Sequence, residues 1–557
     1  VTVNLKNALQ RFRDSSRGRF LWVDAICINQ EDVTERTQQV KMMTEIYSRA
    51  PSVVIWLGDG DTDTDKAMDV IATLSSLLKT EFPDISKYLM GPNGTEFGIS
   101  HVARILEKYQ FQVQPVESDE SAAASLSYLF GNPWFRRIWV LQEVARSWNT
   151  LVISGGKQVY WGELLFSHVW QNTFHKIPGP NGGIVERQHS ITVVPTVWLS
   201  FAENGTSKRL HFFELCLRTR EFRSTDPRDK IFGILALAEE TWQIRHLPLE
   251  LQPNYAKRAI EVYCDFTYGL IRLSKSLELL SAVDPIAVES ALVSGKPLYS
   301  TLPSWVPTLT EGRGIARIFG YLKLYNAAGD TAAVPRSLDQ GKTLILNGTR
   351  FTRVQHISPT FEEVGFQPKQ DNMVGLIAVW AAFLKFTRSN PECPYADNLI
   401  TTFIQTLTCC GFSNASAFRE TIDSLPFDRI LRTSLYPLLE ADFASYWQEM
   451  DPSFRAFTAL PNDRSRLQEQ CAKGRARSFW VLLGNSIDSR RFFFTPDGYF
   501  GLGPSTIEPG DLVCILYGGD IPYILRENPV HRDDVEPAPA LFTFIGECYV
   551  HGVMDGE

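Results

Sequence analysis

The segment FLWVDAICINQEDVTERTQQVKMMTEIYSRAPSVVIWLG, residues 20–58, decides the fold class that we expect. Residues 20–28 are an apolar run with a single charge, Asp24, and they predict a buried β-strand. Residues 33–50 place apolar side chains along one helical face, and residues 52–58 are again apolar and β-branched. A strand, a helix and a strand joined by short links predict a right-handed βαβ unit, and therefore a parallel sheet.

Cap and turn residues mark the elements around this unit. Asp32 and Glu35 have the spacing of a capping box at the start of the helix, and an acidic turn precedes a further helix at residues 63–78. In NPWFRRIWVLQEVARSW, residues 132–148, the opening Asn-Pro pair predicts another helix start. Residues 150–165 predict a strand, a Gly-Gly turn and a strand that leads into a helix.

The second half of the chain has a different pattern. Helical periodicity dominates residues 160–290, before this change, and again residues 371–450, whereas residues 343–358 are strand-like. At the end, short apolar runs separated by the turns PDG, EPGD and GGD predict a small antiparallel sheet or partial barrel. We therefore expect an N-terminal α/β domain, a helical continuation and a C-terminal α+β domain, at residues 1–155, 156–300 and 301–557.

Composition narrows the class of protein. The chain has 557 residues, 44% of them hydrophobic, and a net charge of -8, which favours several packed cores and argues against a nucleic-acid surface. The longest apolar run, residues 373–384, is shorter than the roughly 20 residues that a spanning helix needs. Nine cysteines without a CxxC pair predict free thiols, and nine histidines show no metal-ligand spacing. We expect a cytoplasmic protein with no membrane span, no nucleic-acid partner and no metal.

Asp24 is the first candidate functional residue. A carboxylate within an apolar strand is costly unless it is paired or hydrogen-bonded. One interpretation is that Asp24 accepts hydrogen bonds from backbone groups or an arginine and orders the core. The other is that it lies at the floor of a cleft, because the same strand carries Asn29 and Gln30 to its carboxyl end, where open α/β sheets bind ligands. Cys27, in the same run, is expected to be a buried and inert thiol.

The segment 132–148 holds the second candidate. On a continuous helix one stripe holds Arg136, either Trp139 or Val140, and Glu143, and Arg146 follows one turn beyond Glu143. Apolar flanks would raise the pKa of Glu143, whereas the arginines would lower it. The alternative is an ordinary salt bridge between Glu143 and Arg146 on a surface helix, and the sequence leaves both interpretations open.

Several common catalytic motifs are missing from the sequence. There is no glycine-rich dinucleotide fingerprint after a strand, no P-loop, no nucleophile elbow and no HExxH. GDGDTDTD, residues 58–65, lacks the spacing of a calcium loop and predicts an acidic turn that caps a helix. SGGK, residues 154–157, predicts a hairpin turn. The sequence therefore gives no sign of a dinucleotide-binding fold, a P-loop protein, a nucleophile-elbow hydrolase or an HExxH metalloprotease.

Three of the stretches resemble one family. LWVDAICINQED, NPWFRRIWVLQEVA and DPRDKIFGILALA, in this order, are similar to the heterokaryon incompatibility (HET) domain of filamentous fungi, most densely over residues 1–155. The end of the chain, from FFFTPDGYFGLGP onward, resembles the tail of many HET-domain proteins. The resemblance implies a role in fungal nonself recognition, in which fusion of genetically different hyphae triggers regulated cell death. The family's usual first strand and its SYxWG-like segment are not found, so we expect a truncated start.

HET domains are in turn similar to TIR domains, which implies a TIR-like parallel sheet flanked by helices in the N-terminal domain. Some TIR domains cleave NAD with a glutamate in a W-x-x-x-E pattern, and Trp139 and Glu143 match that spacing. The resemblance implies that Glu143 is a catalytic carboxylate beside an oxocarbenium-like centre, with NAD as the substrate and no cofactor. The residues expected to bind a ligand are Asp24, Asn29, Gln30, Arg136 and Trp139.

Different classes of function remain open from the sequence. The chain is either a signalling module that assembles with itself or with protein partners, or an NAD-cleaving enzyme that assembly switches on. A truncated and inactive family member is the third interpretation. The substitution Glu143→Gln discriminates between the first two, because it keeps the side-chain shape and removes the charge.

Overall fold

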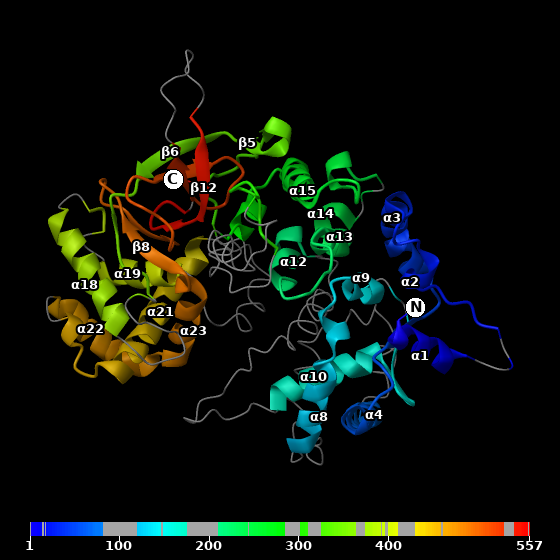
Figure 1. Cartoon of the computed structure of the whole chain (residues 1–557). Coiled ribbons are helices and arrows are strands. Elements are labelled where there is room, and N and C mark those ends of the chain that lie inside the picture. The colour runs from blue at the N-terminus through cyan, green and yellow to red at the C-terminus, as the bar shows by residue number, and fades with distance from the viewer. Residues whose placement is uncertain are drawn as a thin grey trace. The chain divides into compact units, whose positions relative to one another are not determined.

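The computed structural model divides the chain into two compact units, whose elements Figure 1 labels. Unit 1 comprises Val1–Phe266 and Leu309–Gly312, and unit 2 comprises Thr267–Thr308 and Arg313–Glu557. The residues that the structure describes are 2–13, 16, 18–81, 120–145, 147, 149–174, 210–242, 244, 246–284, 301–309, 325–361, 363, 374–390, 393–395, 399–409, 429–457, 460–528, 540–554 and 556.

Unit 1 contains a three-stranded mixed sheet in the order β1-β2-β3. β1 (Val53–Trp56) pairs in parallel with β2 (Thr150–Ser154), and β2 pairs antiparallel with β3 (Lys157–Tyr160). Gly155 closes the β2–β3 hairpin with a φ of 55°, a left-handed conformation that glycine adopts without a side-chain clash. The predicted strand at 52–58 and the predicted hairpin are both confirmed.

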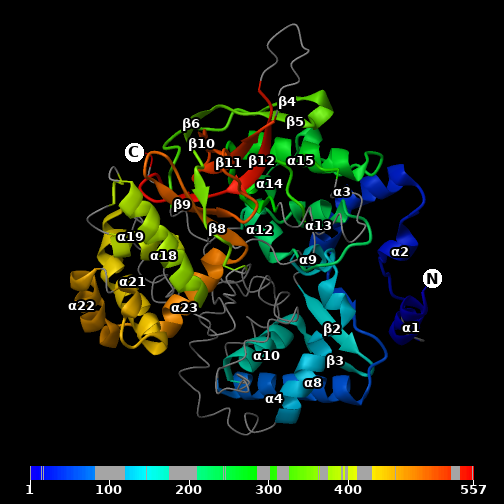
Figure 2. The same cartoon turned by 60° about the vertical axis from the view of Figure 1, so that its left-hand side comes forward.

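Three helices pack beside this sheet, as Figure 2 shows: α4 (Thr62–Glu81), α8 (Glu120–Phe130) and α10 (Trp161–Phe174). α4 and α10 contact β2 and β3, and α8 packs on both helices. Asp61 accepts a hydrogen bond of 2.8 Å from the Thr64 N–H and so caps α4. The prediction that the acidic turn caps a helix is confirmed.

The strand predicted at residues 20–28 is wrong. The structure has a short helix here, α2 (Asp24–Cys27), between α1 (Val3–Phe12) and the long helix α3 (Val33–Arg49). Phe20 is fully exposed and Ile26 is 51% exposed, so these apolar side chains do not contribute to a sheet core. The parallel sheet predicted from this segment is thereby reduced, in the described part of unit 1, to the β1–β2 pair.

Asp24 explains why a helical turn forms at this point. Its carboxylate accepts a 2.8 Å hydrogen bond from the Ala25 N–H in the first turn of α2, where a negative charge is favourable. The charge therefore starts a helical turn instead of interrupting a buried strand. Cys27 is an exposed thiol, so the expectation that it is buried is also wrong.

The start of α3 follows the sequence prediction in part. The Asp32 side chain accepts hydrogen bonds from the N–H groups of Thr34 and Glu35, as an N-cap does. In a capping box the Glu35 carboxylate would accept a hydrogen bond from the Asp32 N–H. In the structure it accepts from the N–H of Asn29 instead, at 3.1 Å. The helix ends at Arg49, before Pro51.

The continuous helix expected at residues 132–148 is broken into two pieces. A 3-10 helix, η3 (Pro133–Arg136), is capped by Asn132 as predicted, and α9 (Val140–Ala145) follows it. Between them Arg137 forms an isolated parallel bridge with Arg223, and the Ile138 N–H donates to the Arg223 carbonyl at 3.0 Å. This non-local pairing removes the single stripe from Arg136 to Glu143. Arg146, and with it the predicted salt bridge, lies outside the described residues.

Short helices complete the described part of unit 1. They lie in and around the segment DPRDKIFGILALA, residues 226–238. Figure 1 and Figure 2 both show α3 beside α13. These helices are α12 (Phe212–Arg218), α13 (Asp229–Leu235), α14 (Glu239–Trp242), η4 (Leu249–Leu251) and α15 (Ala259–Ser274), the last of which contains the boundary between the units.

Unit 2 is a mixture of helices and small antiparallel sheets. One four-stranded sheet has the order β12-β11-β10-β6 and another has the order β13-β9-β8-β7, while β4 and β5 form a separate pair. The predicted terminal antiparallel strands are confirmed, and the strands of the described residues do not form a closed barrel. The strands are β4 (Arg336–Leu338), β5 (Thr343–Ile345), β6 (Gly348–Arg353), β7 (His356–Ile357), β8 (Arg490–Phe494), β9 (Phe500–Pro504), β10 (Leu512–Leu516), β11 (Tyr523–Glu527), β12 (Phe542–Glu547) and β13 (Tyr549–Val550).

The helices of unit 2 lie mainly between β7 and β8 in the sequence, in agreement with the helical pattern expected over 371–450. They are η5 (Glu278–Ala282), η6 (Asp339–Gly341), α18 (Val374–Ser389), α19 (Leu399–Leu407), α21 (Arg429–Met450), η7 (Arg455–Phe457), α22 (Pro461–Gln470), η8 (Cys471–Lys473) and α23 (Ala476–Ile487). Among the described residues, no helix combines the length and the hydropathy that crossing a membrane requires.

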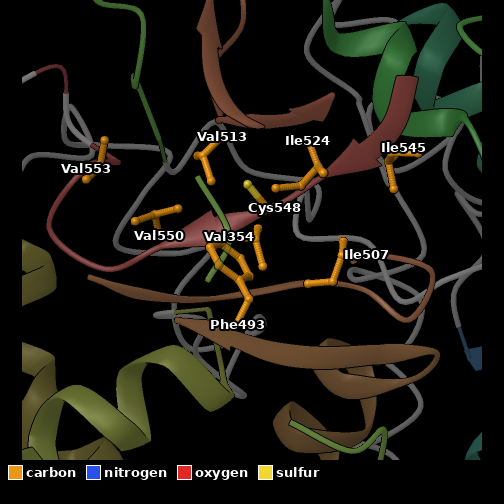
Figure 3. Close-up of a cluster of buried hydrophobic side chains, with 9 residues drawn as sticks. All are labelled: Val354, Phe493, Ile507, Val513, Ile524, Ile545, Cys548, Val550 and Val553. Carbon is orange, nitrogen blue, oxygen red and sulfur yellow. The ribbon is translucent and has the colours of Figure 1, made fainter. Parts of the chain in front are cut away.

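The core of unit 2 draws on both four-stranded sheets (Figure 3). Val513 and Ile524 come from β10 and β11, and Phe493 and Val550 come from β8 and β13. A buried ion pair also joins the sheets, because the Arg490 guanidinium in β8 donates to the Glu547 carboxylate in β12 at 2.7 Å. The eight cysteines that the structure describes are free thiols, as predicted.

Candidate functional site

A cavity of about 720 Å³ lies within unit 1, a volume that suits a small-molecule ligand. Three of the residues predicted to bind a ligand line it: Asp24, Gln30 and Trp139. The other lining residues are Ile28, Arg36, Val40, Met43, Thr225, Asp226, Pro227, Arg228, Asp229, Tyr255, Arg258 and Ala259.

One face of α3 supplies the largest helical part of this lining. Arg36, Val40 and Met43 follow one another at spacings of four and three residues, which places their side chains on one side of the helix. Thr37, next to Arg36, accepts a 3.1 Å hydrogen bond from the Tyr255 N–H and so fixes α3 against the opposite wall. The same amphipathic pattern that predicted the helix therefore positions a cavity wall.

Glu143 and Asp24 interact, although they come from different helices. Burial raises the pKa of Glu143 to about 7, the positive charge of Arg137 opposes this shift, and the negative charge of Asp24 adds to it. The two carboxylates also act on one tyrosine, because burial and both charges raise the pKa of Tyr47. Glu143 is half-buried and is not itself among the residues that line the cavity, whereas Asp24 is.

The remaining predicted site residues are not brought into the cavity. Asn29 is exposed, and its side chain accepts a hydrogen bond from the Glu31 N–H. Arg136 is half-buried in η3, and its carbonyl accepts from the Arg223 N–H. Neither residue lines the cavity, so the structure joins Asp24, Gln30 and Trp139 and separates Asn29 and Arg136 from them.

An arginine–aspartate cluster on the cavity wall was not predicted. The Asp226 carboxylate accepts from Arg36 Nη2 at 2.8 Å and from Arg228 Nε and Nη2 at 2.9 and 2.7 Å. Such forked guanidinium–carboxylate pairs are strong and geometrically specific. By itself the Asp-Pro pair at 226–227 predicts a helix start, and nothing in the local sequence indicates that Arg36 reaches it.

Tyr255 connects this cluster to Trp139. The Arg36 guanidinium lies 3.6 Å from the centre of the Tyr255 ring, and the Tyr255 hydroxyl donates to Asp229 at 2.5 Å. Burial raises the pKa of Asp229, and hydrogen bonds from Tyr255 and Trp139 oppose the shift. The wall therefore presents an aromatic surface and fixed charges of both signs.

The lining offers acceptors, donors and apolar surface to a ligand. Carboxylates at Asp24, Asp226 and Asp229 are matched by guanidiniums at Arg36, Arg228 and Arg258. Among the residues that the structure describes, no cluster of histidine, cysteine and acidic side chains is arranged to hold a metal ion. The chemistry available is binding of a polar organic molecule and acid–base or electrostatic assistance from carboxylates.

Comparison with known proteins identifies both ends of the chain. Residues 1–143 match the sequence model of the family described as Heterokaryon incompatibility protein (HET), and residues 433–557 match the Het-6 beta-barrel domain. The chain is 24% identical over 617 residues to Heterokaryon incompatibility protein 6, OR allele, of Neurospora crassa, covering 100% of this chain and 85% of that protein. No solved structure matches. Asp24, Trp139 and Glu143 lie within the HET match.

Proposed function

We propose that this chain, which matches heterokaryon incompatibility family models at both ends, acts in fungal nonself recognition and that its specific task is to trigger regulated cell death. The observation that carries the proposal is the order of matches along one chain. A HET segment begins it, a Het-6 barrel segment ends it, and the similarity to the Neurospora protein extends over its full length. In this proposal unit 1 carries the death signal, and it does so by assembling with copies of itself or with protein partners in the cytoplasm.

The first prediction concerns killing. Overproduction of the chain in a fungal host is expected to reduce viability, measured by uptake of a vital dye. Death that follows from assembly alone should persist in Glu143→Gln, whereas death that depends on NAD cleavage by Glu143 should be lost. The matched control is Glu45→Gln, because Glu45 is exposed and its carboxylate pairs with Arg49 one turn along α3. A host that survives overproduction of the unchanged chain contradicts the proposal. Equal killing by both variants leaves death signalling in place and removes Glu143 from it.

A second candidate function, NAD cleavage, is favoured by one observation: Asp24 and Glu143 interact beside a ligand-sized cavity. In the proposed reaction water attacks the ribose carbon, the bond to nicotinamide breaks, and ADP-ribose, nicotinamide and a proton are released. A carboxylate near that carbon stabilises the developing positive charge. Glu143 is the proposed catalytic carboxylate, Asp24 is its partner at the cavity surface, and Trp139 and Gln30 contact the substrate.

The second prediction concerns this activity. The purified chain is expected to release nicotinamide from NAD, and Glu143→Gln is expected to lower the rate by about 100-fold or more, the usual contribution of a positioned acid–base group. Because the ionised form is required and the pKa of Glu143 is about 7, the rate should rise between pH 6 and pH 8. The Glu45→Gln variant should keep the full rate. A rate that is independent of Glu143, or a fall over this pH range, contradicts the assignment.

A further inference from the structure

Arg36 is held firmly and still has hydrogen-bond donors to offer. Its Nη2 atom donates to Asp226 at 2.8 Å, and its guanidinium lies 3.6 Å from the centre of the Tyr255 ring. These contacts fix the plane of the group. Arg36 also forms a side-chain hydrogen bond with Tyr255. A guanidinium carries five N–H donors, more than these contacts use, and Arg36 lines the cavity. Within the described part of unit 1, Arg36 therefore presents preoriented N–H groups to a ligand.

Arg228, the neighbouring arginine, has four of its five N–H donors engaged. Its Nε and one Nη atom bind Asp226, and its other Nη atom donates to the carbonyls of Tyr255 and Lys257 at 2.7 and 2.8 Å. Its role is to hold Asp226 in place so that Asp226 in turn orients Arg36. Arg258, the third lining arginine, is mostly exposed and pairs with Glu261.

Asp24 offers the complementary function in the same cavity. Its side chain accepts a hydrogen bond from the neighbouring Ala25 N–H, and a carboxylate has further lone pairs for ligand donors. Asp24 interacts with Glu143 and Tyr47, whereas Arg36 interacts with Asp226 and Tyr255, so the two charges belong to separate parts of the lining. Asp24 suits hydroxyl groups or a cation, and Arg36 suits an anion.

The balance of charges points to the class of ligand. The acidic and basic residues of the lining are equal in number, so the cavity does not select a simple anion or a simple cation. Met43, Val40 and the Trp139 ring add apolar and aromatic surface. A molecule that carries a phosphate, sugar hydroxyls and a planar base satisfies all of these groups at once.

We propose that Arg36 is the phosphate-binding residue of this cavity and makes it selective for nucleotides over the corresponding nucleosides. Arg228 is a positioning residue that acts through Asp226. The inference rests on the proposed use of the cavity for a nicotinamide nucleotide, and it assigns selectivity to a residue that the cleavage chemistry does not use. Charge-assisted hydrogen bonds of this kind contribute about 1.5–3 kcal/mol, which corresponds to roughly 10- to 100-fold in affinity.

The test measures binding without turnover. Isothermal titration calorimetry compares nicotinamide mononucleotide with nicotinamide riboside, which lacks only the phosphate, on the full chain carrying Glu143→Gln. The mononucleotide is expected to bind at least about 10-fold more tightly. Adding Arg36→Gln should abolish that difference, whereas adding Arg49→Gln, which removes a positive charge from the exposed side of α3, should leave it intact. Arg36→Lys, which keeps the charge and loses the planar fork, should give an intermediate preference and guards against misfolding of the glutamine variant.

Equal affinity for the two ligands, no measurable binding of either, or a preference that survives Arg36→Gln in a folded protein would overturn the proposal. The outcomes also separate it from the proposed reaction. If the phosphate preference depends on Arg36 and the unchanged chain does not cleave NAD, the nucleotide site stands and the enzymatic function fails. If NAD is cleaved and Arg36→Gln leaves the phosphate preference unchanged, the reverse holds.

Discussion

Replacing Arg490 by methionine is expected to lower the free energy of unfolding of unit 2 by about 3–5 kcal/mol. The Arg490 side chain is completely buried, and it donates to both the side chain and the carbonyl of Glu547. The substitution leaves a carboxylate inside the core without its guanidinium. Because β8 and β12 belong to different sheets, the loss acts on the contact that holds the two sheets together.

The measurement is urea denaturation followed by circular dichroism, with the shift of the midpoint converted to a difference in free energy. The control is the double variant Arg490→Met with Glu547→Leu, which removes the second charge as well. It should recover a large part of the lost stability, since a buried ion pair replaced by apolar side chains often costs little. A single variant as stable as the unchanged chain would show that this pair is not needed to join the sheets.

Glu143→Gln is expected to raise the free energy of unfolding of unit 1 by about 3 kcal/mol at alkaline pH. Near pH 4.5 it is expected to have little effect. In the folded chain the pKa of Glu143 is raised to about 7, mainly by burial, whereas in the unfolded chain it returns to its ordinary value. The folded state therefore binds the proton more tightly, and its stability falls as pH rises between these two pKa values. Glutamine stays neutral and avoids that loss.

Glu163→Gln is the matched comparison, because its linkage has the opposite sign. Lys79, Ser75 and the Tyr160 N–H all donate to the Glu163 carboxylate and lower its pKa against the effect of burial. Removing that charge should destabilise the chain at neutral pH, and the difference should shrink in acid as the unchanged Glu163 becomes protonated. Thermal denaturation from about pH 3 to pH 8 follows both variants, because the Glu163 difference changes only below the ordinary glutamate pKa, whereas the Glu143 difference changes above it. A Glu143 variant with no pH dependence contradicts the raised pKa and the proposed role of Asp24 in raising it.

Local signals predicted local structure well. Asp32 and Asn132 cap the helices that their side chains indicated, and the Gly-Gly pair at 155–156 closes the expected hairpin. In each case the determining hydrogen bond or torsion angle lies within a few residues of the signal. The strand prediction at 20–28 was wrong because an apolar pattern does not tell whether a partner strand is available. The Asp24 side chain instead accepts a hydrogen bond from the next N–H, which favours a helical turn over a strand.

The residues of the candidate site fall into two groups: those that their own sequence segment indicates, and those that only long-range contacts bring together. Asp24, Gln30 and Trp139 could be selected from the sequence because each stands out in its own segment. The cluster of Arg36, Asp226 and Tyr255 could not, because its contacts join residues separated by roughly 200 positions and each residue by itself has an ordinary local setting. The stripe from Arg136 to Glu143 failed for a related reason: pairing with the distant Arg223 breaks the helix on which the stripe depended.

The reach of Arg36 to Asp226 has a practical consequence for the way such proteins are cut and recombined. A fragment that stops at residue 143, where the HET match ends, keeps Asp24 and Trp139 and loses Asp226, Tyr255 and the rest of their wall. In such a fragment the Arg36 guanidinium on α3 would lack the Asp226 carboxylate, and the cavity would lack the part of its wall that follows residue 143. Chimeras between related chains that are spliced at this boundary would combine parts of one cavity wall from different parents, so a change in ligand binding could not be assigned to either part alone.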